Sequence, residues 1–419
     1  MLCCNFSVIG RRYFVKYKVR MMILFCLVFF ASGCSTFQAI SLVRGGEALS
    51  PGQKEKVLPT EFNGHMILVK GNINGSAKEY RFILDTAALT MIDKETATEL
   101  RLARDVEVKT NDSAGGTKTA HLTKLGRLTI GDITVTNTAA VIMDMTKIRQ
   151  MTGIEVDGII GSNFLRFFTV KIDYQRQQVS LSGDLSPLKA VPGASLVKFE
   201  QSMKQGFAPM VEAASGDVSF KAFIDTGLTY PLSLPLSIVK KADKESVIEG
   251  KGLMGGGFLE NNKKEVLTRL NSFRMGSSSE FGRIVANGTE GKDVALIGKE
   301  FLSRFVVTLN YPAGEMLLVP VSGVKGDDNM FTAGIGVMRD ANGKFLVSGV
   351  WSGSPADKAG VAANDEIVMV NGKGAASYTL GEMRAILKTN DGKDAVDLAI
   401  KNAGGERNLT IKKQFLFAQ

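Results

Sequence analysis

The residues best suited to chemistry come as two copies of one motif, Asp85-Thr86-Ala87 and Asp225-Thr226-Gly227. Each aspartate follows a run of aromatic and β-branched residues, Tyr80–Leu84 or Phe220–Ile224, that favours a strand. Two carboxylates held about 3 Å apart share one proton, so one can accept a proton from water while the other donates to a carbonyl oxygen. A single copy would indicate an ordinary turn; two copies predict a hydrolytic pair that titrates as a unit.

The chain repeats itself beyond this motif. Residues 160–174 align without gaps to residues 297–311, and seven of the fifteen positions are identical. The interval from Asp85 to Gly161 is nearly the same as the interval from Asp225 to Gly298. These spacings predict two halves of one fold, each of which positions one aspartate.

Glycines also recur at equal spacing. Gly115 and Gly116 lie as far beyond the first aspartate as Gly255 and Gly256 lie beyond the second. Paired glycines between strands suit a hairpin tip, where positive φ or close backbone approach is needed. The sequence therefore predicts substrate-binding flaps at both sites, with a flexible surface turn as the alternative.

The motif, the glycine-tipped hairpin and the runs Ile159-Ile160-Gly161 and Leu296-Ile297-Gly298 resemble those of the retropepsin-like and pepsin-like aspartic proteases. The resemblance covers about residues 58 to 322 and implies two mainly β lobes that meet at the aspartate pair. A flap candidate in both halves is closer to a fused retropepsin dimer than to pepsin. The resemblance also implies that Asp85 and Asp225 are catalytic and that Thr86, Thr226, Ala87 and Gly227 support them.

The first motif departs from the family, which usually has Gly where this chain has Ala87. Alanine is compatible with negative φ and costly at positive φ. Because both aspartates and both threonines are present, we expect an active aspartic endopeptidase. The alternative is a peptide-binding scaffold lipoprotein that Ala87 has impaired. Ala88 and Leu228 stand where pepsins often carry Ser or Thr, so fewer hydrogen bonds to the carboxylates predict a milder pH optimum than that of pepsin.

Other polar residues offer less chemistry. Asp173 has Asn310 as its counterpart in the repeat, which favours a turn hydrogen bond over a catalytic role. Asp157 precedes a glycine and is expected to cap a turn. The two histidines, His65 and His121, lack metal-ligand spacing and a nucleophile motif. We expect no metal and no cofactor.

The C-terminal part carries a separate pattern. Residues 350–361 and 364–372 resemble the PDZ domains of bacterial periplasmic proteases. In that family a glycine-containing loop, here Gly334, Ile335, Gly336 and Val337, binds a peptide carboxylate through backbone N–H groups. A helix from Thr379 to Lys388 would form the other wall, and an extended peptide would add as a strand. The alternative is a PDZ fold that serves only as an interdomain brace.

The N-terminus has the features of an export signal. Residues 1–20 carry five basic residues and no acidic one, and Met21–Phe30 form an apolar stretch too short to span a bilayer as a helix. Ala31-Ser32-Gly33-Cys34 resembles a bacterial lipobox; the alternative is an ordinary signal peptide. The resemblance implies lipidation of Cys34 and a periplasm-facing protein anchored in the cell envelope. Ser35 after the cysteine favours the outer membrane.

Processing at Cys34 would remove Cys3, Cys4 and Cys26, which excludes thiol catalysis and a disulfide framework for the mature chain. Loss of five basic residues would lower the formal net charge from +9 to +4. No basic run indicates a nucleic-acid partner. The expected partners are a peptide or protein substrate, a PDZ ligand peptide and the membrane.

The predicted fold class is mainly β, with two pseudo-symmetric retropepsin-like lobes followed by a PDZ domain, a β-barrel with two helices. The predicted divisions are a lipoprotein signal peptide (1–33), a tether (34–57), lobe 1 (58–190), lobe 2 (191–322) and the PDZ domain (330–419). The hydrophobic content of 44% is ample for cores of this size.

Overall fold

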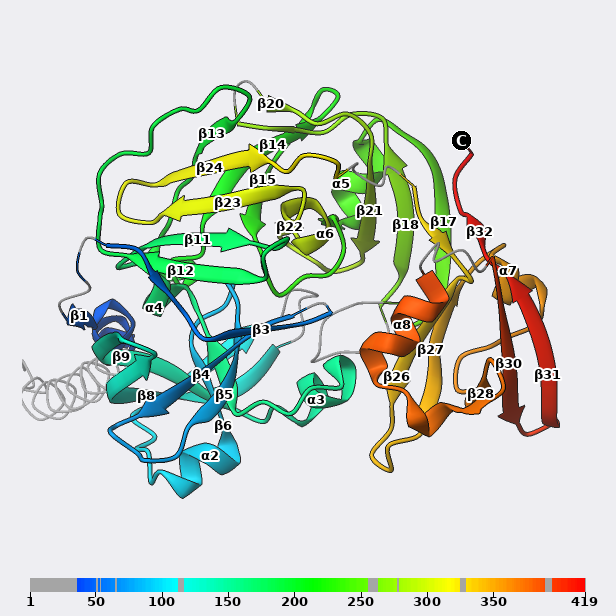
Figure 1. Cartoon of the computed structure of the whole chain (residues 1–419), viewed down its shortest axis with the longest axis horizontal. Coiled ribbons are helices and arrows are strands. Elements are labelled where there is room, and N and C mark those ends of the chain that lie inside the picture. The colour runs from blue at the N-terminus through cyan, green and yellow to red at the C-terminus, as the bar shows by residue number, and fades with distance from the viewer. Residues whose placement is uncertain are drawn as a thin grey trace, which may run out of the picture.

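The structure, a computed structural model, describes residues 36–49, 52, 54–64, 66–111, 117–254, 263–276, 279–324, 329–388 and 394–418. It is mainly β, with two β lobes and a PDZ domain beside them (Figure 1). The predicted fold class is therefore confirmed.

Lobe 1 is built on one nine-stranded sheet. Its helices are α2 (Lys94–Glu99), α3 (Thr146–Thr152) and α4 (Ser162–Leu165). In spatial order the strands are β1 (Glu47–Leu49), β9 (Ile133–Met143), β6 (Met91–Asp93), β10 (Gly158–Ile160), β5 (Tyr80–Leu84), β4 (Met66–Ile73), β8 (Thr117–Ile130) and β7 (Val106–Asn111), with β3 (Thr60–Asn63) on β4.

Lobe 2 repeats the same scheme with helices α5 (Leu236–Lys241) and α6 (Lys299–Leu302) and a 3₁₀ turn, η1 (Met203–Gln205). Its strands in spatial order are β20 (Ser279–Glu280), β19 (Arg274–Met275), β14 (Met210–Ser215), β15 (Val218–Ile224), β22 (Ala295–Ile297), β16 (Leu232–Pro235), β21 (Ile284–Thr289), β18 (Glu265–Leu270) and β17 (Lys244–Gly252).

A six-stranded sheet joins the two lobes. Its order is β13 (Ser195–Lys198), β24 (Glu315–Pro320), β23 (Phe305–Asn310), β11 (Thr169–Asp173), β12 (Gln178–Ser182) and β2 (Lys56–Val57). At its centre β11 and β23 pair antiparallel, with Lys171 opposite Thr308. These two residues occupy the same place in the repeated segments, so the pseudo-twofold axis passes between them.

The core follows from the strand pattern. In β11 and β23 alternate residues face inward, and Val170, Ile172, Val307 and Leu309 are all buried. They belong to one hydrophobic cluster that runs through both lobes. Burial of this shared core, rather than a flexible connection, sets the two lobes against each other.

Asp173 and Asn310 occupy equivalent positions in the repeat, and both can fill the same structural role. Asp173 accepts hydrogen bonds from the N–H groups of Gln175 and Arg176, and Asn310 accepts one from Ala313. Both side chains cap a turn, which confirms the predicted structural role of Asp173.

The PDZ domain has strands β26 (Ile335–Arg339), β27 (Phe345–Trp351), β28 (Glu366–Val370), β29 (Lys373–Gly374), β30 (Ala395–Asn402) and β31 (Gly405–Lys412), with β25 (Phe331–Thr332) paired to β32 (Gln414–Phe415). Its helices are α7 (Pro355–Lys358) and α8 (Leu380–Lys388), with a 3₁₀ turn, η2 (Ala375–Ser377). Thr379 and Glu382 cap the start of α8 reciprocally, Thr379 Oγ1 accepting from the N–H of Glu382 and the carboxylate of Glu382 accepting from the N–H of Thr379. The helix predicted from Thr379 to Lys388 is thereby confirmed.

The PDZ domain is packed firmly on lobe 2. Strand β17 pairs antiparallel with β27, so the lobe 2 sheet continues into the PDZ sheet. Tyr230 and Leu267 share a buried cluster with Trp351 and Phe417. The guanidinium of Arg269 also donates to the carbonyl of Ala418 (2.5 Å). The PDZ domain and lobe 2 thus share one continuous sheet and one buried cluster.

The segment predicted as a tether is largely folded. Residues 36–44 are helical, Ala39, Leu42 and Val43 pack against a lobe 1 cluster, and β1 pairs with β9. The prediction was wrong because it relied on Gly, Ser and Pro content and overlooked apolar residues at helical spacing. Among the described residues, no helix is long and apolar enough to cross a membrane.

Candidate active site

Each motif aspartate lies where a central strand ends. Strands β5 and β15 run parallel to β10 and β22, respectively. The N–H of Asp85 donates to the carbonyl of Ile160 (3.0 Å), and that of Asp225 donates to Ile297 (2.8 Å). The same local pairing therefore places both aspartates, as the repeated spacing predicted.

The glycines that follow β10 and β22 are required by close backbone approach. A Cβ on Gly161 would lie 2.3 Å from the carbonyl oxygen of Ala88, and one on Gly298 would lie 2.2 Å from that of Tyr230. No side chain fits at such distances. The hydrophobic-hydrophobic-Gly pattern thus marks the place where the motif loop crosses the neighbouring strand.

The two motif threonines tie the loops together across the lobe interface. The N–H of Thr86 donates to Thr226 Oγ1 and the N–H of Thr226 donates to Thr86 Oγ1, both at 3.1 Å. The hydroxyls donate in turn to the carbonyls of Ile224 (2.6 Å) and Leu84 (2.9 Å). Both threonines are fully buried, so this four-bond arrangement holds the aspartates face to face.

The carboxylates accept backbone hydrogen bonds from their own loops. Asp85 accepts from the N–H of Ala87 (2.8 Å), and Asp225 accepts from those of Gly227 (2.8 Å) and Leu228 (3.1 Å). These bonds fix the orientation of both carboxyl groups.

Burial and mutual repulsion keep a proton on the pair. Burial raises the pKa of Asp85, while a hydrogen bond with Asp225 acts in the opposite direction. Burial also raises the pKa of Asp225, and the neighbouring charge of Asp85 raises it further. Asp225 is only 7% exposed and Asp85 is half-buried. The pair therefore keeps a shared proton to higher pH than two ordinary carboxyl groups would, and the two groups titrate together.

Ala87 fits its position. Its φ is outside the left-handed region, and its methyl group packs beside Phe223 and Leu296. A Cβ on Gly227, in contrast, would lie 2.6 Å from Asp85 Oδ2. The two lobes are thus unequal here, and only the lobe 2 motif requires glycine.

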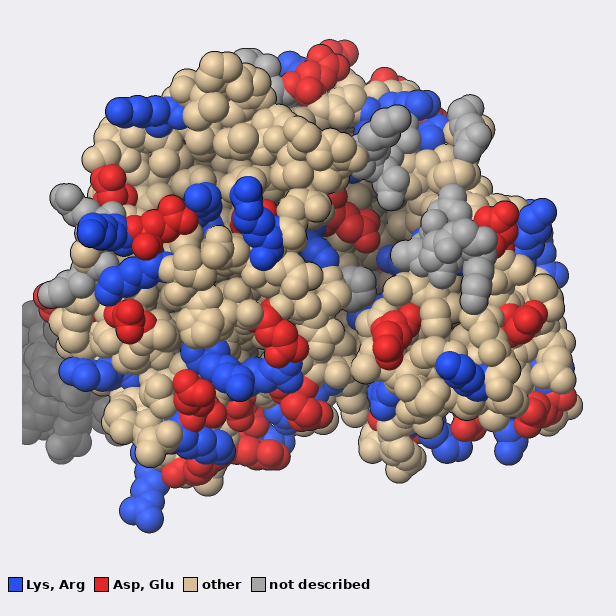
Figure 2. All heavy atoms as spheres, viewed as in Figure 1, with Lys and Arg blue, Asp and Glu red and all other residues tan. Residues whose placement is uncertain are grey.

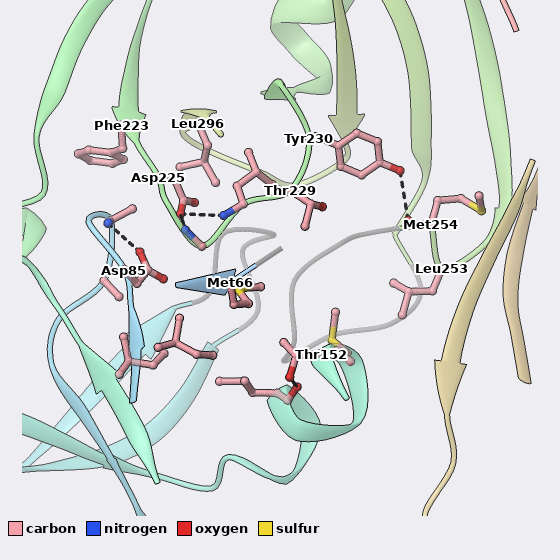
Figure 3. A pocket seen from close by; sticks show the side chains of 18 of the residues that line it. Met66, Asp85, Thr152, Phe223, Asp225, Thr229, Tyr230, Leu253, Met254 and Leu296 are labelled. Atoms are coloured by element: carbon pink, nitrogen blue, oxygen red, sulfur yellow. Dashed lines mark hydrogen bonds between the residues drawn. The ribbon is translucent and has the colours of Figure 1, made fainter. Parts of the chain in front are cut away.

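A cavity of about 640 Å³ adjoins the aspartate pair (Figure 3). Ile83 and Ile159 line it from lobe 1, and Phe223 and Leu296 line it from lobe 2. Each of these residues precedes the motif aspartate or the following glycine by two positions, so the walls on either side of the dyad are equivalent and apolar. Figure 2 shows the protein surface hollowed where the lobes meet the PDZ domain.

The predicted flap glycines, Gly115, Gly116, Gly255 and Gly256, lie outside the described residues. The strands that would carry them are antiparallel hairpins, β7 with β8 and β17 with β18. Lys109 on β7 and Leu253 and Met254 after β17 line the cavity. Both hairpins therefore contribute residues to the cavity that adjoins the aspartate pair.

The predicted PDZ loop faces the same cavity. Ile335, Gly336 and Val337 line it together with Arg384 and Lys388 of α8. Gly334 has a positive φ of 88°, and a Cβ there would lie 2.2 Å from the side chain of Ser354, so only glycine fits. The PDZ groove and the aspartate pair thus open onto the same cavity.

Several residues in and around the cavity were not predicted from the sequence. Met151 and Thr152 come from α3, for which no helix was predicted, and Tyr230 hydrogen bonds through its hydroxyl to the carbonyl of Met254 (3.3 Å). The hydroxyl of Ser162 donates to the carbonyl of Thr86. Asp157, expected to cap a turn, instead accepts from the N–H of Arg81 (2.7 Å) in β5. The apolar spacing within residues 146–152 was the one available signal for α3.

Two further predictions concern other sites. Cys34, the predicted lipidation residue, lies outside the described residues, as does His65. Within the described ranges, no three His, Cys, Asp or Glu side chains gather closely enough to hold a metal ion.

Comparison with known proteins finds two family matches, one in lobe 1 and one in the PDZ domain. The aspartyl protease family matches residues 69–164, which include Asp85, and the PDZ domain family matches residues 346–402. The chain is also 35% identical over 82 residues to the carboxy-terminal processing protease CtpA of Bacillus subtilis (strain 168). That match covers 19% of this chain and 17% of the relative, so it spans only a small part of that protein. This chain therefore combines an aspartyl protease domain with a C-terminal PDZ domain.

Proposed function

We propose that the protein is an aspartic endopeptidase in which Asp85 and Asp225 activate the water that hydrolyses a peptide bond. The observation that supports this most strongly is the reciprocal bonding of Thr86 and Thr226 beneath the two carboxyl groups. A turn with no catalytic role does not need a buried, cross-lobe arrangement of this kind. The raised pKa of both aspartates is also typical of a catalytic carboxylate pair.

For the proposed chemistry we assign the shared proton to Asp225, the more buried aspartate. Charged Asp85 accepts a proton from a water that lies between the carboxyl groups, while protonated Asp225 donates its proton to the carbonyl oxygen of the scissile bond. The water oxygen bonds to the carbonyl carbon and gives a neutral tetrahedral intermediate. Asp85 then returns a proton to the leaving nitrogen, the carbon–nitrogen bond breaks, and Asp225 regains its proton as the new carboxyl group forms.

The substrate that best suits the cavity is an extended peptide with apolar side chains on both sides of the scissile bond. Ile83 and Ile159 offer an apolar wall on one side, and Phe223 and Leu296 offer one on the other. Burying a large apolar side chain against such a wall contributes roughly 1.5–3 kcal/mol. The β7–β8 and β17–β18 hairpins would hold the peptide main chain.

Ala87 does not favour the scaffold alternative. Its backbone conformation suits alanine, and its methyl group packs against apolar side chains. Gly227 keeps the Asp85 side of the pair open. We therefore prefer the enzyme to the impaired peptide-binding lipoprotein.

We further propose that Cys34 is lipidated, that the protein faces the periplasm from the outer membrane, and that the PDZ groove binds peptide or protein tails. Metabolic labelling with a clickable fatty acid tests the anchor, with Cys34→Ser as the matched control. Incorporation into both proteins, or into neither, would contradict lipidation at this cysteine.

The decisive experiment is cleavage of a random peptide library by residues 36–419, across about pH 3 to 8. Asp85→Asn and Asp225→Asn should each abolish cleavage while leaving the circular dichroism spectrum unchanged. The matched control is Asp173→Asn, because Asp173 caps a turn outside the cavity. Equal cleavage by the wild type and either dyad variant would sink the proposal.

A further inference from the structure

The free edge of the PDZ strand β26 is bonded to lobe 1 through Arg384. Val337 pairs with Val347 on β27. The N–H of Val347 donates to Asp365 and its carbonyl accepts from Asn364, so both groups point away from β26. In an antiparallel ladder the partner of such a residue also directs its N–H and C=O outward. Val337 therefore presents these groups to the groove beside α8, where an added peptide strand would pair.

Arg384 crosses this groove. Its Nη2 donates to the carbonyl of Val337 (3.3 Å) and to the carbonyl of Met151 at the end of α3 (2.6 Å). Arg384 is half-buried, and this burial lowers its pKa to about 10. One guanidinium nitrogen thus joins the PDZ strand edge to lobe 1.

The end of α3 also packs against the PDZ helix. Gly153 ends α3 with a positive φ of 68°, and a Cβ on it would lie 2.7 Å from Cβ of Leu380, the first residue of α8. Helix α3 contacts β26 as well. Lobe 1 therefore occupies the part of the groove that lies beside Leu380 and Arg384.

The contacts of the PDZ domain with lobe 2 are of a different kind. They comprise the β17–β27 pairing, a shared buried cluster and the bond from Arg269 to Ala418. The β17–β27 pairing lies at the edge of β27 opposite β26, so a peptide that adds to β26 leaves this pairing in place. The bridge through Arg384 to Met151, in contrast, uses the groove itself.

Helix α3 is also a wall of the catalytic cavity. Ile148, Met151 and Thr152 line the same hollow as Asp85 and Asp225. Figure 3 shows Thr152 on the side of the cavity opposite Phe223 and Leu296. A change at the Arg384 bridge is therefore a change at the mouth of the active site.

We propose that α3 is a latch that closes the active-site cleft against the PDZ domain, and that an extended peptide with a free C-terminal carboxylate releases it by adding to β26. This inference rests on the proposed proteolytic function for its effect on rate, but not for its structural part. The incoming strand takes the Val337 carbonyl from Arg384 and enters the space of the α3 end. With α3 released, the PDZ side of the cleft opens, and an extended substrate passes through more readily.

The charge and the backbone geometry of the groove favour a peptide with a free C-terminal carboxylate. Lys388 lines the groove with Arg384, and its Nζ lies 5.1 Å from the ring centroid of Tyr230. The two cations favour an anionic chain end over an amide or a cationic one, and the outward-facing N–H and C=O of Val337 can pair with the peptide main chain.

The structural test is hydrogen exchange of the Asp85→Asn protein, which keeps the fold while preventing cleavage. The probes are a pool of octapeptides with random C-terminal residues and free carboxylates, and the same pool amidated. The free-acid pool should bind and raise the exchange rate of residues 146–153 by about 5-fold or more, a typical allosteric coupling. Binding of neither pool, or binding with unchanged exchange in these residues, would overturn the proposal.

The functional test compares Arg384→Ala with Arg339→Ala. Arg339 also donates to a backbone carbonyl near the groove, that of Tyr378, but this bond stays within the PDZ domain. Arg384→Ala should raise kcat/KM about 5-fold and remove stimulation by the free-acid pool, whereas Arg339→Ala should behave as the wild type. If the wild type is active, and Arg384→Ala keeps the wild-type basal rate but is not stimulated by the free-acid pool, the latch is overturned and the proposed proteolysis stands. Inactivity of every variant, with the exchange response present, refutes proteolysis and leaves the latch.

Discussion

Replacing Gly227 with alanine tests how closely the two motif loops approach the dyad. The added Cβ would lie 2.6 Å from Asp85 Oδ2 and 3.2 Å from Asp225 Oδ1. An ordinary contact of this kind needs about 3.4 Å or more. The Asp85 carboxyl group must therefore move by about 0.8 Å, and its bond from the N–H of Ala87 limits where it can go.

A shift of this size has a calculable effect on rate. Misplacing a reacting group by about 1 Å costs on the order of 100-fold in rate, so Gly227→Ala should lower kcat/KM by roughly 30- to 100-fold. The global fold should survive, because Gly227 has no positive φ and alanine restricts the unfolded chain by about 0.4–1 kcal/mol. The assay is hydrolysis of a quenched fluorescent peptide, with urea unfolding of the same preparation.

The matched control is Ala87→Gly at the equivalent position in lobe 1. Alanine already fits there, so its removal should change kcat/KM by less than about threefold while costing about 0.4–1 kcal/mol of stability. Near wild-type activity of Gly227→Ala would refute the close-approach argument. So would an equal loss of activity in both variants, because the contact exists on one side only.

Three other changes have distinct expected results. Thr226→Val removes the hydroxyl that pairs with the buried N–H of Thr86 and the carbonyl of Leu84. It should lower the free energy of unfolding, measured by urea titration, by about 2–4 kcal/mol. A loss below about 1 kcal/mol would contradict the role of this threonine in holding the two loops together. Because folding raises the pKa of Asp225, ionisation of this side chain opposes folding as the pH rises from its unfolded pKa toward its folded pKa. Asp225→Asn should therefore be inactive yet more stable than the wild type near neutral pH, and the gain in stability should vanish in acid. Equal stability profiles of the two proteins would contradict this. Phe223→Ala should lower kcat/KM for substrates with large apolar side chains by roughly 10-fold and spare those with alanine; a uniform loss would contradict a specificity role.

The pH dependence of activity follows from the same aspartate pair. Hydrolysis needs one proton on the dyad, and burial raises the pKa that governs loss of that proton. The alkaline limb of the rate profile should therefore lie at higher pH than for an ordinary carboxyl group. The mild optimum stays a prediction, and the structure suggests burial rather than missing hydrogen-bond donors as its physical basis.

The sequence repeat and the structure agree where local interactions decide the outcome. The strand before each aspartate, the glycine beneath each motif loop and the caps at Asp173 and Asn310 depend on residues near in the chain or on hard steric limits. The α8 helix is of the same kind, because Thr379 and Glu382 cap it locally. Such features leave a direct record in residue type and spacing.

The helix at residues 36–44 is an element that residue type and spacing did not predict. Its composition suggests a linker, and an isolated helix of that length is marginal in water. Ala39, Leu42 and Val43 nevertheless become ordered because lobe 1 offers them a buried cluster. Their stability comes from packing against residues distant in the chain, which composition does not report.

The sequence by itself determined that two aspartates would stand at equivalent strand ends in two β lobes, followed by a PDZ domain, because the repeated pattern specifies equivalent local structure. Only the tertiary structure decided that burial raises the pKa of both aspartates, that Ala87 is tolerated while Gly227 is required, and that Arg384 joins the PDZ groove to α3. Each of these depends on burial or on contacts between segments far apart in the chain. Two copies of one motif look alike as residues, and their surroundings make them different.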